Sequence, residues 1–248
     1  MKFTIEKNIL LENLGNVTKA ISIKNVIPVL NGIKMELKDD GLYLTASDTD
    51  LTIKSFIKRD KIKRVEEEGS IVIQSKYINE IIRKLPDDTV DIEVIDGLKV
   101  IIKAKTSQFS LNCLRVEDYP AIKIDYQKDP IIIKGGLFKS IIKQTSFAIG
   151  TQESRPMLTG LNMKIQGNIL EVTATDSYRL AKKTIALDDF VKEEIDITIP
   201  GNNINELDKI INDDEPIEMH IFTNKILFLY KNITFQSNLL SGTYPNTN

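Results

Sequence analysis

Apolar residues near the start of this chain change from strand-like to helix-like spacing. Residues Lys2–Glu6 alternate between polar and apolar side chains, which predicts a strand. Apolar residues then recur every three or four positions, which predicts a helix. The same order is predicted again from Ile131–Lys134 onward. The apolar residues of the two predicted helices are Ile9, Leu10, Leu14 and Val17, and then Leu137, Phe138, Ile141 and Ile142.

Each half of the chain contains a second predicted helix, and strands make up most of the rest. The second helix of the first half begins near Ser75, a good N-cap residue, and ends before Pro86. Its counterpart covers 203–211. Strands are predicted at 33–37, 42–46, 51–57, 90–95, 98–105, 108–114, 216–222, 225–230 and 233–239. Because the links between strands are short, the strands pair mostly antiparallel and the fold class is α+β.

The two halves are copies of one another. When the chain is shifted by 128 positions, residues 28–48 align with 156–176 and the pairs Pro28/Pro156, Gly32/Gly160 and Asp48/Asp176 are identical. Further along, at a shift of 126, the sequence INE at 78–80 aligns with INE at 204–206. Ordered matches along a whole chain indicate duplication. We therefore predict two domains, about 1–125 and 126–248.

The composition is that of a globular protein, with 42% hydrophobic and 27% charged residues among 248. The single cysteine, Cys113, is expected in the core and the single histidine, His220, in a strand, either facing solvent or as a satisfied polar group. One residue of each kind allows no internal disulfide and no His/Cys-rich metal site. Apolar runs are too short to span a membrane, so an intracellular protein is expected.

The net charge of −2 is unlike that of a typical basic nucleic-acid binder, but the charges are unevenly placed. Basic residues lie on the predicted helices, among them Lys76, Arg83, Lys139 and Lys143, whereas acidic residues cluster in predicted turns. Two interpretations stay open. The helices present ordinary solvated faces, or the duplicated domains collect positive charge on one face that suits a polyanion.

Sequence motifs for nucleotide binding, metalloproteases and serine hydrolases are absent. The duplicated Asp48 and Asp176 form the basis of an alternative hypothesis, an enzyme on a duplicated α+β scaffold that uses both carboxylates. A simpler explanation is that each aspartate follows a strand and caps backbone N–H groups in a turn.

Several segments resemble the bacterial DNA polymerase III β subunit, the sliding clamp. They are MKFTIEKNILLENLGNVTKAI at the start, IPVLNGIKMEL, LEVTATDSYRLA at 170–181, and SGTYPNT near the end. The resemblance covers the whole chain. It implies tandem clamp domains, each with two helices packed on antiparallel sheets. In that family two three-domain chains close a homodimeric ring around duplex DNA, and this chain matches the first two domains only.

The resemblance also implies function and site residues. It implies a non-catalytic processivity factor, without cofactor or metal, in the bacterial cytoplasm and associated with the nucleoid. Its partners are double-stranded DNA and the short hydrophobic motifs of the replicative polymerase, the clamp loader and repair proteins. The matching peptide pocket is Leu158, Thr175, Ser177, Tyr178, Arg179, Leu180 and Pro245. The DNA contacts are Lys24, Arg83 and Gln152, to which the helix-face argument adds Lys76, Lys139 and Lys143.

Two features of the sequence depart from the family pattern. Pro156 and Met157 stand where some relatives carry aromatic residues, and the segment 201–203 lacks a lysine that is often found there. Because the third domain is not part of this chain, a six-domain ring made from three two-domain chains is kept as a second mode of assembly.

Overall fold

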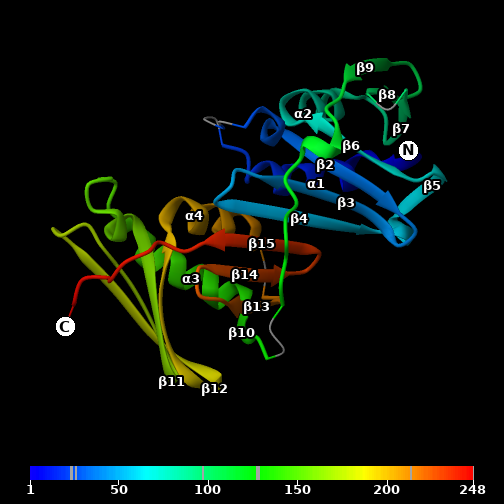
Figure 1. Ribbon diagram of the computed structural model, residues 1–248. Helices are drawn as coiled ribbons and strands as arrows, with labels where there is room; N and C mark the ends of the chain where they lie inside the picture. The colour runs from blue at the N-terminus through cyan, green and yellow to red at the C-terminus, as the bar shows by residue number, and fades with distance from the viewer. Residues whose placement is uncertain (23–24, 26, 97, 127–128, 213, 248) are drawn as a thin grey trace. The chain divides into compact units, whose positions relative to one another are not determined.

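The structure is a computed structural model that describes residues 1–22, 25, 27–96, 98–126, 129–212 and 214–247 (Figure 1). Lys24, one of the predicted DNA contacts, lies outside these residues. The chain divides into two compact units, Met1–Lys123 and Ile124–Asn248. Both units combine helices with antiparallel strands, so the predicted α+β class and the tandem arrangement are confirmed.

Unit one consists of two antiparallel sheets and two helices. One sheet has the strand order β5-β1-β7-β8-β9, and the strands β4-β3-β2-β6 are neighbours in the other. The helices are α1 (Lys7–Thr18) and α2 (Ser75–Lys84). The strands are β1 (Lys2–Glu6), β2 (Gly32–Lys38), β3 (Gly41–Ser47), β4 (Leu51–Lys58), β5 (Ile62–Glu67), β6 (Gly69–Gln74), β7 (Thr89–Ile95), β8 (Lys99–Lys103) and β9 (Gln108–Asn112).

Unit two repeats this plan, with two long strands, β11 and β12, in place of several shorter ones. The strands β10-β13-β14-β15 are neighbours in one sheet, and β11 and β12 form a long antiparallel hairpin (Figure 1). The helices are α3 (Gly135–Thr145) and α4 (Gly201–Ile210). The strands are β10 (Ile131–Lys134), β11 (Gly160–Thr175), β12 (Leu180–Pro200), β13 (Pro216–Ile221), β14 (Lys225–Tyr230) and β15 (Ile233–Asn238).

The strand registers of the two units agree with the duplication. Ser47 pairs with Thr52 in unit one, and Thr175, which lies 128 positions after Ser47, pairs with Leu180. Gly32 likewise pairs with Gln74, and Gly160 with Pro200. Because a slip of one residue would turn every side chain to the other face of the sheet, the shared register preserves the same core positions in both copies.

Most of the apolar helix positions are buried as the spacing predicts, but some details were wrong. Leu137 on α3 is 40% exposed, although Phe138, Ile141 and Ile142 are buried. Ser75 is the first residue of α2 and not its N-cap, which is Gln74 and makes no side-chain cap hydrogen bond. The predicted start at residue 203 is two residues late, because α4 begins at Gly201.

The two rare residues are both buried. Cys113 is buried as expected, and burial raises the pKa of its thiol to about 11. His220 lies on β13 at 2% exposure, so of the two expectations the solvent-facing one was wrong. Its Nε2 lies 3.6 Å from a carboxylate oxygen of Glu218, and its ring meets that of Tyr126 edge-on. These contacts make His220 a structural residue of unit two.

Candidate binding pocket and basic helix faces

A tight turn at Asp176–Arg179 connects β11 to β12. The Asp176 Oδ1 atom accepts hydrogen bonds from the backbone N–H groups of Tyr178 and Arg179, both at 3.0 Å. Its Oδ2 atom accepts a 2.9 Å bond from Arg179 Nε. The backbone N–H of Tyr178 contributes most to lowering the pKa of the Asp176 carboxyl. Ser177 has a φ of 78°, in the left-handed region, and the side chain of the next residue, Tyr178, is 94% exposed.

Unit one contains the same turn. Asp48 Oδ1 accepts the N–H of Leu51 at 2.8 Å and that of Asp50 at 3.2 Å, and Thr49 has a φ of 84°. Burial raises the pKa of the Asp48 carboxyl. Both aspartates therefore cap backbone N–H groups within their own units, as the simpler explanation predicted.

A pocket of about 160 Å³ lies beside the Asp176–Arg179 turn. Its walls come from the loop after α3, from the short 3₁₀ helix Pro156–Thr159 and from the turn itself. The Gly150 N–H donates to the Leu158 carbonyl at 2.8 Å, which joins the loop to the 3₁₀ helix. The lining residues are Ile149, Gly150, Thr151, Gln152, Arg155, Leu158, Asp176, Tyr178 and Arg179.

Exposed apolar side chains surround this pocket. Tyr178 is 94% exposed, Leu180 is 49% exposed and Phe147 is 57% exposed. The Arg179 guanidinium lies 5.9 Å from the centre of the Phe147 ring. A small concave site with aromatic and aliphatic groups beside one cation suits an apolar ligand that also offers carbonyl or carboxylate oxygens.

The other predicted pocket residues support the turn or lie beside it. Thr175 Oγ1 donates to the Arg179 carbonyl at 2.7 Å, and Ser177 Oγ accepts a 2.8 Å bond from Arg155 Nη1. The Tyr244 hydroxyl accepts the Thr175 N–H at 3.0 Å, which fastens the final segment to the turn. Pro245, next in the chain, is exposed and is not part of the lining.

Sequence reasoning missed several members of this site. Ile149, Gly150, Thr151 and Arg155 line the pocket, and the exposed Phe147 lies next to Arg179, which is also part of the lining. Gln152, predicted to contact DNA, also lines this pocket. The exposed aromatic after α3 gave no signal in the sequence, because the loop joins the site only through tertiary packing.

The predicted basic residues on the helices differ in their surroundings. Lys76, Arg83 and Lys143 are exposed, and within the described part of the chain they form no ion pair. Lys139, by contrast, is partly buried. Its ammonium donates to the carbonyls of Asp208 and of Ile211, the latter at 2.5 Å, at the C-terminal end of α4. The Lys139 ammonium therefore already uses N–H donors that it would need for a contact with a phosphate.

We expect Lys139→Met to lower the free energy of unfolding of unit two by about 1–2 kcal/mol, because two carbonyls at the end of α4 lose their donor. The matched control is Lys143→Met, one turn further along α3, where a change under about 0.5 kcal/mol is expected. Urea unfolding of both variants measures this difference. Equal losses would mean that the Lys139 contacts do not stabilise the helix pair.

The described residues contain no group of three or more His, Cys, Asp or Glu side chains placed to hold a metal ion. No helix among them has the length and apolar character needed to cross a membrane.

Comparison with known proteins places the whole chain in one family. The family model described as DNA polymerase III beta subunit, N-terminal domain, matches residues 1–123, and the model of the central domain matches 132–246. The beta sliding clamp of Bacillus subtilis (strain 168) is 42% identical over 252 residues, an alignment that covers 100% of this chain and 67% of that protein.

Solved structures agree. The crystal structure of the DNA polymerase sliding clamp from Bacillus subtilis matches with a TM-score of 0.96 at 41% identity, over 100% of this chain and 66% of that one. A sliding clamp from Pseudomonas aeruginosa bound to griselimycin matches with a TM-score of 0.92 at 26% identity, over 99% and 66%. This chain spans about two thirds of these relatives.

The fold is that of the sliding clamps, with two tandem α+β domains that each contain a pair of helices. The chain belongs to the DNA polymerase III beta subunit family, of which it contains the N-terminal and central domains. This membership confirms the resemblance seen in the sequence. The relatives are sliding clamps, so they give no support to the enzyme hypothesis based on Asp48 and Asp176.

Proposed function

We propose that this chain supplies two domains, 1–125 and 126–248, of a DNA sliding clamp that tethers the replicative polymerase to duplex DNA. The observation that carries this proposal is the open pocket beside Tyr178, in a chain whose family consists of polymerase β subunits. The clamp makes and breaks no bond. Its contribution is topological, because a closed ring slides along the duplex without falling off.

The pocket is proposed to bind short hydrophobic motifs of the polymerase, the clamp loader and repair proteins. Apolar side chains of the motif would cover Leu158, Tyr178 and Leu180. In the free chain Leu158 is buried, Tyr178 is almost fully exposed and Leu180 is half exposed. Arg179 would orient the motif through its carbonyl or carboxylate oxygens. The turn around Thr175 and Ser177, fastened by Tyr244, pre-organises the site, and Pro245 stays a proposed contact from the family resemblance alone.

The DNA-facing surface is proposed to consist of the exposed helix cations Lys76, Arg83 and Lys143. Long cationic side chains make weak contacts to phosphates that carry no sequence information, which suits sliding. Lys24 and Gln152 remain proposed contacts from the family resemblance, and Gln152 is shared with the pocket. Lys139 is the least suited, because its ammonium already binds carbonyls of unit two.

Tethering raises the effective concentration of a polymerase at the primer end without a new contact to DNA. In the intact family member a homodimeric ring is proposed, with the family's third domain completing each subunit. Replication of the bacterial chromosome places this function in the cytoplasm, at the nucleoid.

The salt dependence of DNA binding tests the basic surface. We expect Lys76→Ala, Arg83→Ala and Lys143→Ala together to reduce the slope of log K against log salt by about 2–3, because each lost phosphate contact removes about 0.9. The matched control removes three exposed cations that lie off the helices, Arg115, Lys123 and Lys192. Binding of both variants to a linear duplex is measured by anisotropy at low salt. Equal effects of the two triple variants would contradict the assignment of the helix faces.

A further inference from the structure

The strand β10 has one open edge. It pairs with β13, from Ile131 with Met219 to Lys134 with Pro216, and among the described residues no strand pairs with its other side. Its counterpart in unit one, β1, pairs on both sides, with β7 and with β5. An unpaired edge presents a row of backbone donors and acceptors that can accept another strand.

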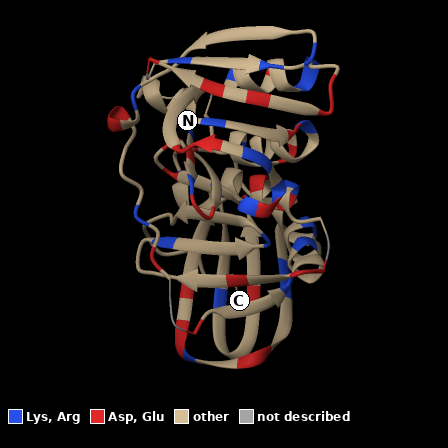
Figure 2. Cartoon of the chain, turned by 90° about the vertical axis from the view of Figure 1, so that its right-hand side faces the viewer, with Lys and Arg blue, Asp and Glu red and all other residues tan. Residues whose placement is uncertain are grey.

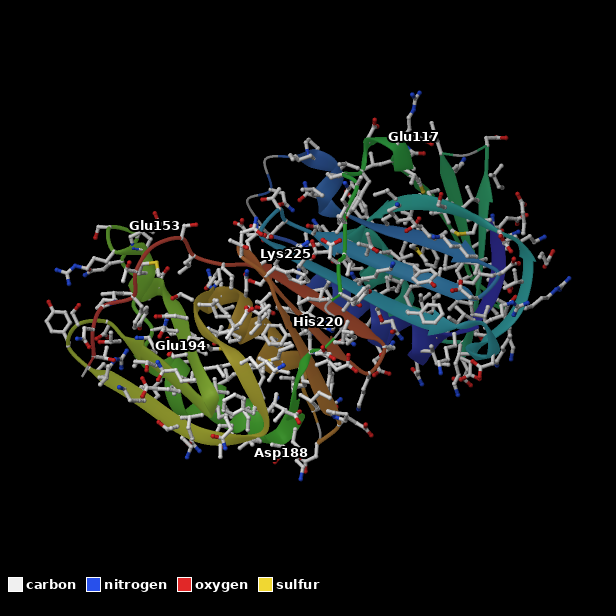
Figure 3. All side chains as sticks on the ribbon, turned by 60° about the horizontal axis from the view of Figure 1, so that its bottom comes forward. Glu117, Glu153, Asp188, Glu194, His220 and Lys225 are labelled. Atoms are coloured by element: carbon white, nitrogen blue, oxygen red, sulfur yellow. The ribbon has the colours of Figure 1, made fainter. Side chains whose placement is uncertain are left out.

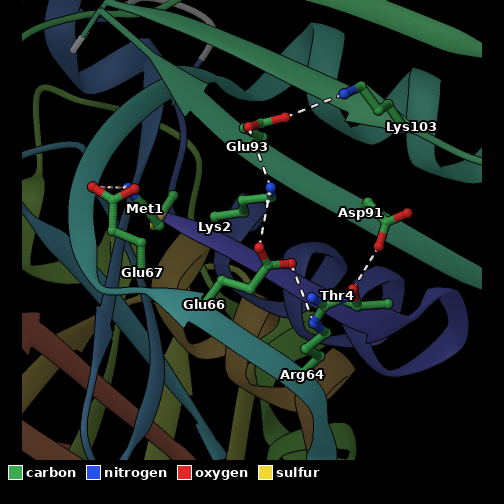
Figure 4. Close-up of polar contacts among 9 residues, drawn as sticks. All are labelled: Met1, Lys2, Thr4, Arg64, Glu66, Glu67, Asp91, Glu93 and Lys103. Carbon is green, nitrogen blue, oxygen red and sulfur yellow. Dashed lines mark hydrogen bonds and ion pairs between the residues drawn. The ribbon is translucent and has the colours of Figure 1, made fainter.

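Ion pairs hold β5 on β1 in unit one (Figure 4). The N-terminal ammonium of Met1 lies 3.5 Å from Glu67, and Lys2 Nζ lies 3.1 Å from Glu66 and 3.5 Å from Glu93. The acidic residues of β5 therefore meet cations of β1. The two strands pair antiparallel, from Lys2 opposite Glu67 to Ile5 opposite Ile62.

Unit two lacks this arrangement. At the shift of 128, Asp129 and Pro130 stand where Met1 and Lys2 stand, so a carboxylate and a residue without N–H replace two cations. The segment that corresponds to 59–68 is also shorter and covers 187–194. Its bounds follow from the strand register: the pair Gly41/Lys58 corresponds to the pair Ile169/Ala186, and the pair Leu37/Gly69 corresponds to the pair Ile165/Ile195. The segment runs on within β12 and does not pair with β10.

A groove of about 1290 Å³ lies between β10, β12 and the end of β13. Its apolar lining includes Ile132, 47% exposed, and Phe190, 75% exposed. Its acidic lining includes Asp129, Asp189, Glu193 and Glu194, with Lys192 as the cation among them. Figure 2 shows acidic residues at the bottom of the view, in unit two, and Figure 3 labels Asp188 and Glu194 on β12.

We propose that this groove binds an extended, basic peptide segment of a partner protein, which adds a strand to the open edge of β10. Backbone hydrogen bonds to β10 would supply affinity, and alternate apolar side chains would cover Ile132 and Phe190. Lysine or arginine side chains of the peptide would pair with the carboxylates of the groove. In unit one, carboxylates of the corresponding segment pair with the cations of Met1 and Lys2. The carboxylates of the groove repel nucleic acid, so the occupant is a protein segment.

This groove is separate from the pocket at Tyr178. The two share no lining residue, and Figure 3 shows Glu153, next to Gln152 of the pocket, far from Asp188. The proposal therefore does not depend on the proposed clamp function, and either can fail alone.

The test uses a labelled synthetic peptide of sequence KVKVTVK as the probe for the chain. We expect it to bind, to weaken with added salt, and to lose affinity about tenfold or more when Glu193 and Glu194 are both changed to lysine. A peptide with N-methyl groups on alternate backbone nitrogens keeps the side chains but cannot pair with a strand, so it should not bind. Amide exchange of Ile131–Lys134 should slow when the unmodified peptide binds.

The matched control is the double change Glu117→Lys and Asp118→Lys, two adjacent exposed acids in unit one. It should leave peptide affinity unchanged. The proposal is overturned if the probe does not bind, if both charge reversals act equally, or if the N-methylated peptide binds as well. It is also overturned if light scattering shows that a second copy of the chain occupies the groove and excludes the probe.

Discussion

Tyr178→Ala is expected to weaken the binding of a short synthetic peptide that ends in Leu-Phe by about thirtyfold, the effect typical of an aromatic hot spot. The Tyr178 ring is 94% exposed in the free chain and lines the pocket, so a ligand can bury nearly all of it. Leu180→Ala should cost less, about five- to tenfold, since Leu180 is already half buried. Fluorescence anisotropy measures both affinities.

The matched control is Tyr77→Ala, which removes another exposed tyrosine from α2 of unit one. It should bind the peptide like the unchanged chain. Because neither Tyr178 nor Tyr77 contributes to a core, both tyrosine variants should unfold at the same urea concentration as the unchanged chain. If both Tyr178→Ala and Leu180→Ala bind the peptide with unchanged affinity, the assignment of this pocket as the peptide-binding site is contradicted.

Phe228→Ala is expected to lower the free energy of unfolding of unit two by about 3–5 kcal/mol. Phe228 on β14 has no exposed surface, and its ring centre lies 5.6 Å from that of Phe138 and 6.1 Å from that of Phe235. Alanine leaves a cavity between α3 and the sheet and removes two aromatic contacts. Urea unfolding, with amide exchange followed separately in 1–123 and 124–248, measures the loss.

Phe190→Ala serves as the control for size and residue type, because Phe190 is 75% exposed on β12. We expect it to change the stability of unit two by less than about 1 kcal/mol. A loss in Phe228→Ala no larger than that in Phe190→Ala would contradict the placement of the aromatic cluster in the core.

The sequence predicted the parts of the fold that depend on local spacing and on duplication. Leu10, Leu14 and Val17 are buried because a helix places every third or fourth residue on one face. Leu137 has the same spacing but lies at the edge of the α3 face, where neighbouring elements decide its exposure. Spacing fixes the direction of a side chain but not what covers it.

The candidate site shows the same limit. The roles of Asp48 and Asp176 as turn caps were predictable, because an aspartate bonds to N–H groups two and three residues ahead. The lining by Ile149, Gly150 and Arg155 was not, since it depends on how the loop after α3 packs on the turn. The contacts of Lys139 with the end of α4 also join residues about 70 positions apart.

The acidic residues illustrate a wrong prediction with a structural cause. The acidic pairs and runs at 66–68, 188–189 and 193–194 were predicted to lie in turns and loops, but Glu66 and Glu67 are in β5, and Asp188 and Glu194 are in β12. In unit one these charges are balanced by the cations of β1. The local sequence pattern could not predict this pairing, because it joins segments about 60 residues apart.

The measurement that tests the clamp assignment most directly is an NMR titration of the ¹⁵N-labelled chain with the Leu-Phe peptide. We expect saturable shifts confined to the backbone amides of residues 149–158 and 175–180 and of Tyr244, the segments that form and fasten the pocket. Shifts that are absent, or that appear only outside these segments, would contradict the account.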